Sequence, residues 1–538
     1  MNFALKLAAT SLLALAAGAA FAQQQQPPEA AKCAGLRGMS IPAAAIGEPT
    51  SGADVYFAQY VDGDAAAGGA YCQLNGGIDP VDPEAPDINF QVNLPLQWNS
   101  KAIQFGGGGY NGTLRTATDQ VSFGAADAKT PLQRGYATYG SDSGHQTPSP
   151  IDGRFLMNDE ALANFGGAQL KKTHDVAMAL IKAFYGSEPA RNYIQGNSQG
   201  GHEGLIAIQR WPGDYDGALV THPANPFSAL QMSGNMAGKA LYQKSAWVGP
   251  EGVELLNGAV AKACDKLDGV EDGLIGNTAA CAKTFDVASL RCASGAAGDG
   301  CFSDAQITAL DVINSRWVSP VKLQGGADGF ERWPIYEGGD LYGLWGVGKR
   351  PEASVPPTPV ADFGLAVLAD PLIRFAIARD PKFNSFEFDP AKWTDRLVAV
   401  SNLIDANEPD LSPFVARGGK MLLMHGTIDF AITPYNTVEY YNRVVAAMGA
   451  DKAREFMRFY MVPGFGHGSG KFQMRWDPLT VLENWVEKDE APGALVATDA
   501  AKETAGRTRP MCEYPAYPHF KAGANDPNSA ASFECREN

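Results

Sequence analysis

One pentapeptide, Gly-Asn-Ser-Gln-Gly at residues 196–200, constrains the fold of this chain more than any other feature. Residues 191–195 before it are expected to form a strand, and residues 200–210 after it a helix. Between a strand and a helix, flanking glycines allow close packing, and a sharp turn holds the central hydroxyl above the sheet edge. The motif therefore predicts a nucleophile elbow at Ser198, and a glycine-rich turn without a chemical role is the alternative.

Strand and helix patterns alternate along much of the chain. Strands are expected at residues 101–105, 135–139, 191–195, 216–221, 420–424 and 456–462, and helices at about 168–184, 200–210 and 436–448. Such alternation is typical of a mostly parallel sheet with helices on both faces. Together with the elbow, it predicts an α/β protein with the α/β-hydrolase fold.

The alternation stops in a long middle segment. Residues 227–393 are rich in glycine, proline and cysteine, and they lie between two expected strands. An insertion at this point of an α/β sheet lies over the carboxyl ends of the strands, where ligands bind. We expect a first part of the core at residues 23–226, a lid domain at 227–397 and a second part of the core at 398–538.

Two residues late in the chain can complete the chemistry of Ser198. A serine hydroxyl needs a general base, and the order along an α/β-hydrolase chain is serine, acid, histidine. Asp429 and His467 each follow a strand pattern, so both are expected at the same sheet edge as Ser198. The sequence predicts His467 as the base and Asp429 as the acid that orients its imidazole. Asp405 is an alternative acid, and a structural role is the alternative for His467.

Two backbone segments can stabilise the negative charge that develops when Ser198 attacks a carbonyl. The amide of Gln199 lies at the start of the expected helix. A second amide is expected from the glycine run after the strand at 101–105, which comprises Gly106, Gly107, Gly108 and Gly109. Without side chains, these amides can approach a ligand closely, and we favour Gly108 as the donor.

The N-terminal residues and the cysteines indicate export. Lys6 precedes an apolar stretch that ends in Ala-Phe-Ala at 20–22, which is typical of a signal peptide at residues 1–22. The cysteine count is even, which suggests four disulfides, although spacing alone leaves their pairing open. A secreted or periplasmic protein without a membrane span after cleavage is expected, and an uncleaved membrane anchor is the alternative. The net charge of −16 argues against nucleic acid as a partner.

An acidic loop lies within the middle segment at residues 265–273, with the sequence Asp-Lys-Leu-Asp-Gly-Val-Glu-Asp-Gly. Hard carboxylate oxygens clustered on a tight loop suit Ca²⁺. The spacing of Asp265, Asp268 and Asp272 is not that of an EF-hand, and a solvated turn explains the spacing equally well.

These motifs together resemble the tannase and feruloyl esterase family, which also includes bacterial mono(hydroxyethyl) terephthalate hydrolases. The resemblance extends from about Cys33 to Cys535. It is carried by the glycine run, the elbow and the acidic loop, and further by Asp-Ser-Gly-His at 142–145, Asp-Tyr-Asp-Gly at 214–217, His-Gly-Thr-Ile-Asp at 425–429, Tyr-Tyr at 440–441 and Gly-Phe-Gly-His at 464–467. It implies a serine esterase that acts on esters of aromatic acids, of the feruloyl, galloyl or phthalate type.

The resemblance also implies a structural calcium site in the lid and a pairing of the cysteines. The implied calcium ligands are Asp265, Asp268, the carbonyl of Val270, Asp272 and the carbonyl of Leu274. The implied disulfides are Cys33–Cys72, Cys264–Cys281, Cys292–Cys301 and Cys512–Cys535. The family typically has a further disulfide beneath the triad, but here Asn197 and Gly468 stand at those positions. Hydrogen bonds, some of them from Asn197, and packing are expected to support the triad instead.

Substrate-binding residues are harder to assign. Aromatic residues of the expected lid can line a pocket, although packing in the lid core is the alternative for most of them: Trp333, Tyr336, Tyr342, Trp345, Phe363 and Phe375. Basic residues that can bind a substrate carboxylate are Arg332, Arg350, Arg374 and Lys349. Competing hypotheses are a carbohydrate acetyl or aliphatic esterase, a serine peptidase on the same fold, and a non-catalytic calcium-stabilised binding protein.

Overall fold

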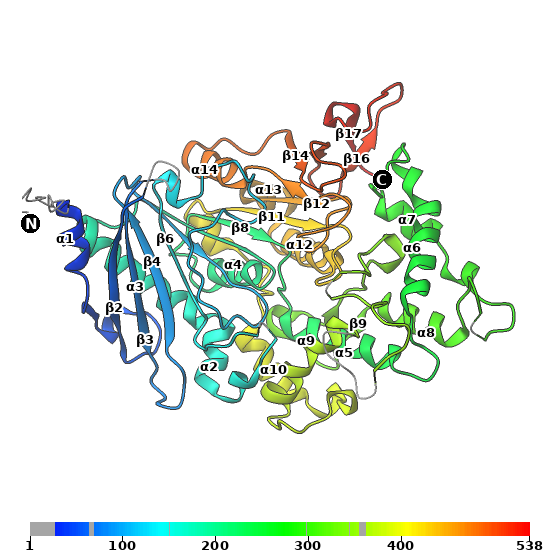
Figure 1. Cartoon of the computed structure of the whole chain (residues 1–538), viewed down its shortest axis with the longest axis horizontal. Helices are drawn as coiled ribbons and strands as arrows, with labels where there is room; N and C mark the ends of the chain where they lie inside the picture. The colour runs from blue at the N-terminus through cyan, green and yellow to red at the C-terminus, as the bar shows by residue number, and fades with distance from the viewer. Residues whose placement is uncertain (1–26, 64–68, 150, 297, 344, 355–361) are drawn as a thin grey trace, which may run out of the picture.

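The computed structural model describes residues 27–63, 69–149, 151–296, 298–343, 345–354 and 362–538, so the expected signal peptide lies outside the described residues. A sheet of ten strands forms the centre of the described part, in the order β1-β2-β3-β4-β6-β5-β7-β8-β11-β12. Helices pack on this sheet, and a large helical region lies beside it (Figure 1).

The sheet has an antiparallel half and a parallel half. The antiparallel strands are β1 (Ser40–Ile41), β2 (Gly52–Val61), β3 (Tyr71–Asp79) and β4 (Ile88–Pro95). The parallel strands are β5 (Lys101–Phe105), β6 (Ala137–Ser141), β7 (Arg191–Asn197), β8 (Gly217–Thr221), β11 (Lys420–Gly426) and β12 (Met457–Val462). An antiparallel beginning followed by parallel strands, with β6 and β5 exchanged in order, is the arrangement of an α/β-hydrolase, as predicted.

The parallel strands around the predicted site end at one edge of the sheet. Asn197 of β7 pairs with Thr221 of β8, which pairs with Met424 of β11. Gly426 of β11 pairs with Val462, the last residue of β12. The residues that follow these strand ends therefore emerge side by side, at the edge where open α/β sheets bind ligands.

Alternate residues of the parallel strands are buried on opposite faces of the sheet. Helix α14 (Pro478–Lys488) covers one face, where Trp485 belongs to the same apolar cluster as Leu219 and Leu422. Helices α4 (Gln199–Arg210) and α12 (Pro434–Met448) cover the other face, where their apolar residues pack with Val220 and Leu423. Helix α3 (Gln169–Tyr185) packs on the antiparallel half. The smaller helices of the core are α1 (Pro28–Ala34), α2 (Asp159–Ala163), α11 (Ser412–Ala416) and α13 (Ala450–Phe456).

A long insertion separates β8 from β11, although these two strands are neighbours in the sheet. Its helices are α5 (Phe227–Leu241), α6 (Pro250–Cys264), α7 (Thr278–Thr284), α8 (Asp304–Ile313), α9 (Gly364–Pro371) and α10 (Thr394–Ile404), and its short strands are β9 (Trp317–Val318) and β10 (Gly329–Phe330). The middle segment without a strand–helix alternation is therefore largely helical. Its apolar residues, including Phe302, Leu310 and Trp333, belong to one cluster with Tyr110 and Phe165 of the core, so the insertion, which lies beside the sheet, also packs against the core (Figure 1).

The C-terminal part forms small sheets beside the insertion. Strands β13 (Met474–Arg475), β14 (Leu495–Asp499) and β15 (Thr508–Met511) form one sheet, and β16 (Tyr517–Phe520) and β17 (Phe533–Arg536) form another. Arg509 of β15 forms an ion pair with Asp272 of the acidic loop. The chain's last strands thereby contact the insertion.

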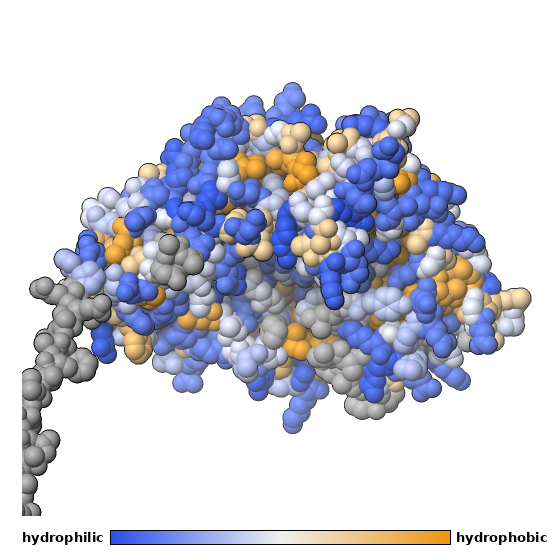
Figure 2. Space-filling view, turned by 45° about the horizontal axis from the view of Figure 1, so that its top comes forward, coloured by the Kyte–Doolittle hydropathy of each residue, from blue (hydrophilic) through white to orange (hydrophobic). Residues whose placement is uncertain are grey.

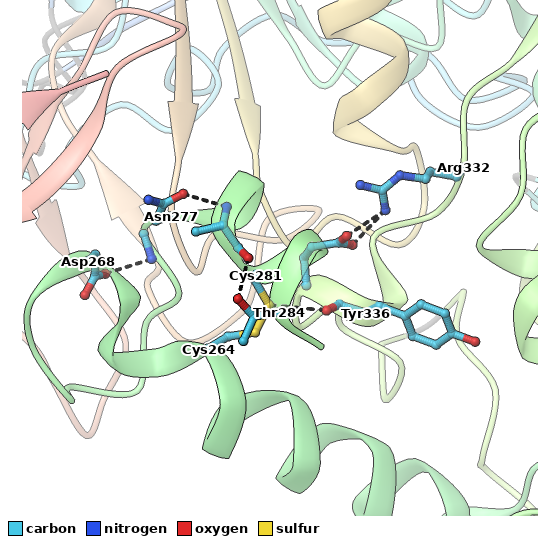
Figure 3. Close-up of a disulfide and its surroundings, with 10 residues drawn as sticks. Cys264, Asp268, Asn277, Cys281, Thr284, Arg332 and Tyr336 are labelled. Atoms are coloured by element: carbon cyan, nitrogen blue, oxygen red, sulfur yellow. Dashed lines mark hydrogen bonds and ion pairs between the residues drawn. A yellow bond between two sulfur atoms is a disulfide. The ribbon is translucent and has the colours of Figure 1, made fainter. Parts of the chain in front are cut away.

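Four disulfides join the cysteines in the implied pairs. They are Cys33–Cys72, Cys264–Cys281, Cys292–Cys301 and Cys512–Cys535, and no described cysteine is free. Cys264–Cys281 joins the end of α6 to α7 directly behind the acidic loop, where the sulfur of Cys281 also lies 3.3 Å from the carbonyl oxygen of Tyr336 (Figure 3). The pairing that the resemblance implies is confirmed.

The face of the molecule in Figure 2 is mostly hydrophilic, with apolar residues in small separate groups. None of the helices in the described ranges is both long enough and apolar enough to cross a bilayer.

Candidate active site

The turn between β7 and α4 has the geometry of a nucleophile elbow. Ser198 has φ 64° and ψ −122°, a conformation that non-glycine residues rarely adopt, and α4 begins at the next residue. A Cβ atom on Gly196 would lie 2.3 Å from the carbonyl oxygen of Gly200, and one on Gly201 would lie 2.3 Å from that of Thr221. Any side chain at these two positions would force strand and helix apart, so the flanking glycines are a steric requirement.

His467 and Asp429 meet at the same sheet edge. Nδ1 of His467 lies 2.8 Å from Oδ2 of Asp429, in hydrogen-bond contact. Ser198 and His467 line one cavity. The structure therefore brings the three predicted triad residues together, and a hydroxyl, an imidazole and a carboxylate in this order can transfer acyl groups.

Asp429 is completely buried and is held on both of its oxygens. Oδ1 accepts the amide hydrogens of Ala431 and Ile432, and Oδ2 also contacts Nε2 of His425 at 3.2 Å. Burial alone would raise the pKa of Asp429, but the neighbouring His467 and His425 hold it well below its usual value. The carboxylate is therefore ionised, and it can stabilise an imidazolium at His467.

The alternative acid, Asp405, lies elsewhere. Its carboxylate accepts hydrogen bonds from the amide and hydroxyl of Ser228 and from the hydroxyl of Ser401. Asp405 therefore joins the start of α5 to α10, and its carboxylate does not face an imidazole. His519 lies on β16 beside Arg536, away from Asp429.

A second buried histidine, His222, supports the site and was not predicted from the sequence. It directly follows β8, and its Nε2 accepts the amide hydrogen of Gly426 at 3.1 Å. Its Nδ1 must therefore carry the proton, which it donates to Oδ1 of Asn197 at 2.8 Å. The ring lies 5.4 Å from that of His467, and burial lowers the pKa of His222 well below its usual value. A neutral imidazole thus connects the elbow to β11, and the expected hydrogen bond of Asn197 is present.

Two of the four backbone amides of the glycine run donate hydrogen bonds within the described parts of the protein, and two do not. The amide of Gly106 donates to the carbonyl of Gln195, and that of Gly107 donates to the buried carboxylate of Glu203. Neither is available to a ligand. The amides of Gly108 and Gly109 have no hydrogen bond within the described parts of the chain, and Gly109 lines the cavity of Ser198.

The cavity above Ser198 lies between the core and the insertion. Its walls are formed by Gly109, Tyr110, Ser198, Gln199, Ala224, Phe227, Leu230, Gln231, Trp345, Leu368, Ala431, Ile432 and His467. Tyr110, Phe227 and Trp345 make the wall partly aromatic. Apart from His467, no Asp, Glu, Lys, Arg or His among the described residues contributes to this wall.

Most of the predicted substrate residues lie elsewhere. Of the six aromatic residues, only Trp345 lines the cavity; Trp333, Tyr336, Phe363 and Phe375 are buried in the insertion, and Tyr342 is exposed. Arg332 pairs with Glu337 and lies over the ring of Tyr435. Arg350 pairs with Asp362, Arg374 pairs with Asp370, and Lys349 does not line the cavity.

The acidic loop turns its carboxylates onto its own amides. Asp265 accepts the amide hydrogen of Gly273, and Asp268 accepts that of Gly276 (Figure 3). Asp272 accepts the amide hydrogen of Leu274 and also pairs with Arg509. Burial raises the pKa of Asp268 to about 7, with further contributions from the charges of Asp272 and Asp265.

Two other groups of described residues bring histidine and aspartate ligand atoms within 4.8 Å of one another. The first is His222, His425 and Asp429, whose atoms are already engaged in the contacts above. In the second, comprising His174, Asp175 and Asp214, the ammonium group of Lys171 bridges the two carboxylates. Hydrogen bonds and ion pairs within the protein account for both groups.

Comparisons with known proteins show which family the chain resembles. Residues 72–536 match the family described as tannase and feruloyl esterase. An uncharacterized esterase of Agrobacterium fabrum is 41% identical over 532 residues, which cover 96% of this chain and 95% of the relative. Mono(2-hydroxyethyl) terephthalate hydrolase of Piscinibacter sakaiensis is 31% identical over 523 residues, which cover 88% of this chain and 85% of the relative.

The fold is also that of solved members. The crystal structure of feruloyl esterase B from Aspergillus oryzae has a TM-score of 0.76 and 21% identity, over 94% of this chain and 100% of that chain. The family match spans most of the sequence, and both curated relatives exceed 30% identity. The chain therefore belongs to the tannase and feruloyl esterase family and is a carboxylic ester hydrolase.

Proposed function

We propose that this chain is an exported serine esterase that hydrolyses esters of aromatic acids through an acyl-enzyme. Oγ of Ser198 attacks the ester carbonyl while His467 takes its proton, and the imidazolium then protonates the leaving alcohol. The same imidazole activates the water that releases the acid. One observation carries the proposal: the imidazole of His467 contacts buried Asp429 at 2.8 Å, in the cavity that Ser198 also lines.

The oxyanion of the tetrahedral intermediate needs two preorganised donors. The amide of Gln199 at the start of α4 is one, because it directly follows the nucleophile. The other is the amide of Gly108 or Gly109, since those of Gly106 and Gly107 are engaged.

The insertion acts as the lid that shapes the acyl-binding site. Phe227 and Leu230 of α5 and Leu368 of α9 contribute to the cavity wall, together with Tyr110 from the core. Apolar and aromatic walls favour an aromatic acyl group. The names of two relatives, a mono(2-hydroxyethyl) terephthalate hydrolase and a probable feruloyl esterase, support the same substrate class.

A substrate panel tests the aromatic specificity. We expect kcat/KM for methyl ferulate or methyl gallate to exceed that for methyl butyrate by about tenfold or more, because the aliphatic acyl group leaves part of the cavity wall uncovered. Hydrolysis rates of the purified mature chain measure this. Faster hydrolysis of methyl butyrate or of acetylated sugars would support the aliphatic or carbohydrate esterase instead. A fluorophosphonate should label Ser198, and absence of the label would support a binding protein without catalysis.

We also propose that the acidic loop binds Ca²⁺ in a structural role. Its donor set fits the ion, since three carboxylates and the carbonyls of Val270 and Leu274 are all hard oxygens. Asp268 is 3% exposed, and the nearby carboxylates of Asp265 and Asp272 add negative charge. Bound Ca²⁺ would neutralise this charge and connect α6 to the C-terminal strands through the loop.

Removal of the ion should lower stability more than turnover. EDTA is expected to reduce the melting temperature by roughly 5 °C, because a ligand that binds only the folded state stabilises it. Differential scanning fluorimetry with and without added Ca²⁺ measures this. The Asp268→Asn variant should lose the response, whereas Asp286→Asn, which changes a helix-capping aspartate of the same insertion, should keep it. A wild-type melting temperature unaffected by EDTA would refute the site.

Export is the remaining part of the proposal. The signal-like residues 1–22 and the four disulfides support it, because disulfides persist in oxidising compartments.

A further inference from the structure

The carboxylate of Glu203 is buried behind the cavity, one and a half turns along α4 from Ser198. Its side chain is only 1% exposed. Oε2 accepts the amide hydrogen of Gly107 at 2.7 Å, and Oε1 accepts hydrogen bonds from the side-chain amides of Asn111 and Gln169. These three donors, all within the described residues, are neutral.

These contacts fix the turn that follows β5 at two points. The amide of Gly107 and the side chain of Asn111 are bound to the same carboxylate, and the amide of Asn111 donates to the carbonyl of Gly108 at 2.8 Å. The unengaged amides of Gly108 and Gly109 lie between these two points. Their direction therefore depends on how Glu203 holds the turn.

Close packing keeps this turn against the helix that carries the nucleophile. A Cβ atom on Gly106 would lie 2.6 Å from the Cα of Gly200 and 2.9 Å from Oε2 of Glu203. Helix α4 thus positions both donors that are expected to bind an oxyanion. These are the amide of Gln199 and that of Gly108 or Gly109. Burial of a carboxylate without a cation in contact with it costs folding free energy, so a contribution to stability does not explain why Glu203 is buried here.

We propose that Glu203 is a positioning residue for the oxyanion site: its carboxylate holds the turn 107–111 so that the amide of Gly108 or Gly109 points at the oxyanion formed on Ser198. The inference rests on the proposed function, because it concerns the tetrahedral intermediate of that reaction. Glu203 itself contacts neither the substrate nor the reacting atoms.

Three variants test this role. Glu203→Leu removes both acceptors. Glu203→Gln keeps one carbonyl oxygen for Gly107. Its new NH₂ group can donate to Oδ1 of Asn111 once the side-chain amide of Asn111 turns over, because this oxygen has no hydrogen-bond partner in the described residues. Asp499→Asn is a control for the loss of a buried carboxylate elsewhere, because Asp499 accepts several hydrogen bonds and pairs with Arg507 but lies on β14 outside the cavity wall.

The readouts are kcat and KM for 4-nitrophenyl acetate, the affinity for phenylboronic acid, and the melting temperature. Phenylboronic acid forms a tetrahedral adduct with a serine, which places an oxygen in the oxyanion site. We expect Glu203→Leu to lower kcat and the boronate affinity by about 10- to 100-fold while KM changes little, since an oxyanion donor acts mainly in the transition state. Glu203→Gln should keep kcat within about threefold of wild type, and Asp499→Asn should leave both quantities unchanged.

Two outcomes would overturn the inference. One is that Glu203→Leu loses melting temperature but keeps kcat and boronate affinity, which would make Glu203 merely structural. The other is that Asp499→Asn lowers kcat and boronate affinity as much as Glu203→Leu does. Failure of the proposed function itself is distinguishable, because it would appear as wild-type protein that neither binds phenylboronic acid nor is labelled at Ser198.

Discussion

Replacement of Ser198 by alanine should abolish ester hydrolysis, with a loss of kcat on the order of 10⁴-fold or more. Alanine retains the Cβ atom at φ 64° but removes the oxygen that attacks the carbonyl, so the turn can form while the acyl-enzyme cannot. Initial rates with 4-nitrophenyl acetate and the mass of the protein after fluorophosphonate treatment measure the two consequences. The variant should fold, with a melting temperature close to that of the wild type.

The chain offers a matched control for this substitution. Ser245 also has a positive φ, 62°, but it is exposed and does not line the cavity. Ser245→Ala should therefore keep full turnover and normal labelling. Turnover by Ser198→Ala at close to the wild-type rate would refute Ser198 as the nucleophile.

Asp429→Asn is expected to lower kcat about 10⁴-fold without unfolding the site. The side-chain oxygen of the asparagine is held toward the amides of Ala431 and Ile432, which need an acceptor. Its NH₂ group must then face His467, where it would donate to Nδ1 and leave the proton on Nε2. An imidazole in that tautomer cannot take the proton of Ser198, so the loss should appear in kcat rather than in KM.

Asp405→Asn separates this effect from general loss of a buried carboxylate. Asp405 accepts hydrogen bonds from Ser228 and Ser401 and has no contact with an imidazole in the described structure. Its replacement should change kcat by less than about tenfold. If Asp405→Asn were the more damaging substitution, the acid of the triad would have to be reassigned.

The parallel half of the sheet could be predicted because its signals are local. Strands 101–105, 191–197 and 420–426 are short segments that end at or beside glycines, and the glycines after residue 195 also predicted the elbow at Ser198. The strand expected at 135–139 is shifted to Ala137–Ser141, because Gly135 instead ends a turn in the left-handed conformation. Sequence patterns give the presence of a strand more reliably than its ends.

The antiparallel half could not be predicted in the same way. From Tyr56 onward, strand β2 is at least partly exposed on both faces, and the exposed residues include the aromatic Tyr56 and Phe57, so apolar residues do not mark one buried face. Residues 71–79 of β3 contain two consecutive glycines, which weaken a strand pattern. These strands exist because β2 pairs with β3 and β3 pairs with β4, and that pairing leaves no local signal in the sequence.

In the site, the sequence predicted the residues whose order along the chain is characteristic of the fold. It did not predict the residues whose role depends on the hydrogen bonds they form. The triad has a known chain order, so Asp429 and His467 could be chosen among the acids and histidines. His222 and Glu203 lie in the same half of the chain as Ser198, and nothing in their spacing distinguishes them from core residues. Their importance depends on which amides they meet, and only the three-dimensional arrangement shows that Gly107 is already engaged by Glu203.

The insertion leaves the sheet after β8 and rejoins it at β11, its immediate neighbour. The two ends of its helical part meet just beyond β8, where the amide of Ala406 donates to the carbonyl of Asn225 at 2.8 Å. A segment tethered so narrowly can lengthen, shorten or be exchanged between homologous genes without altering strand pairing in the sheet. Evolution can thus diversify which esters the enzyme accepts while inheriting its reaction centre intact.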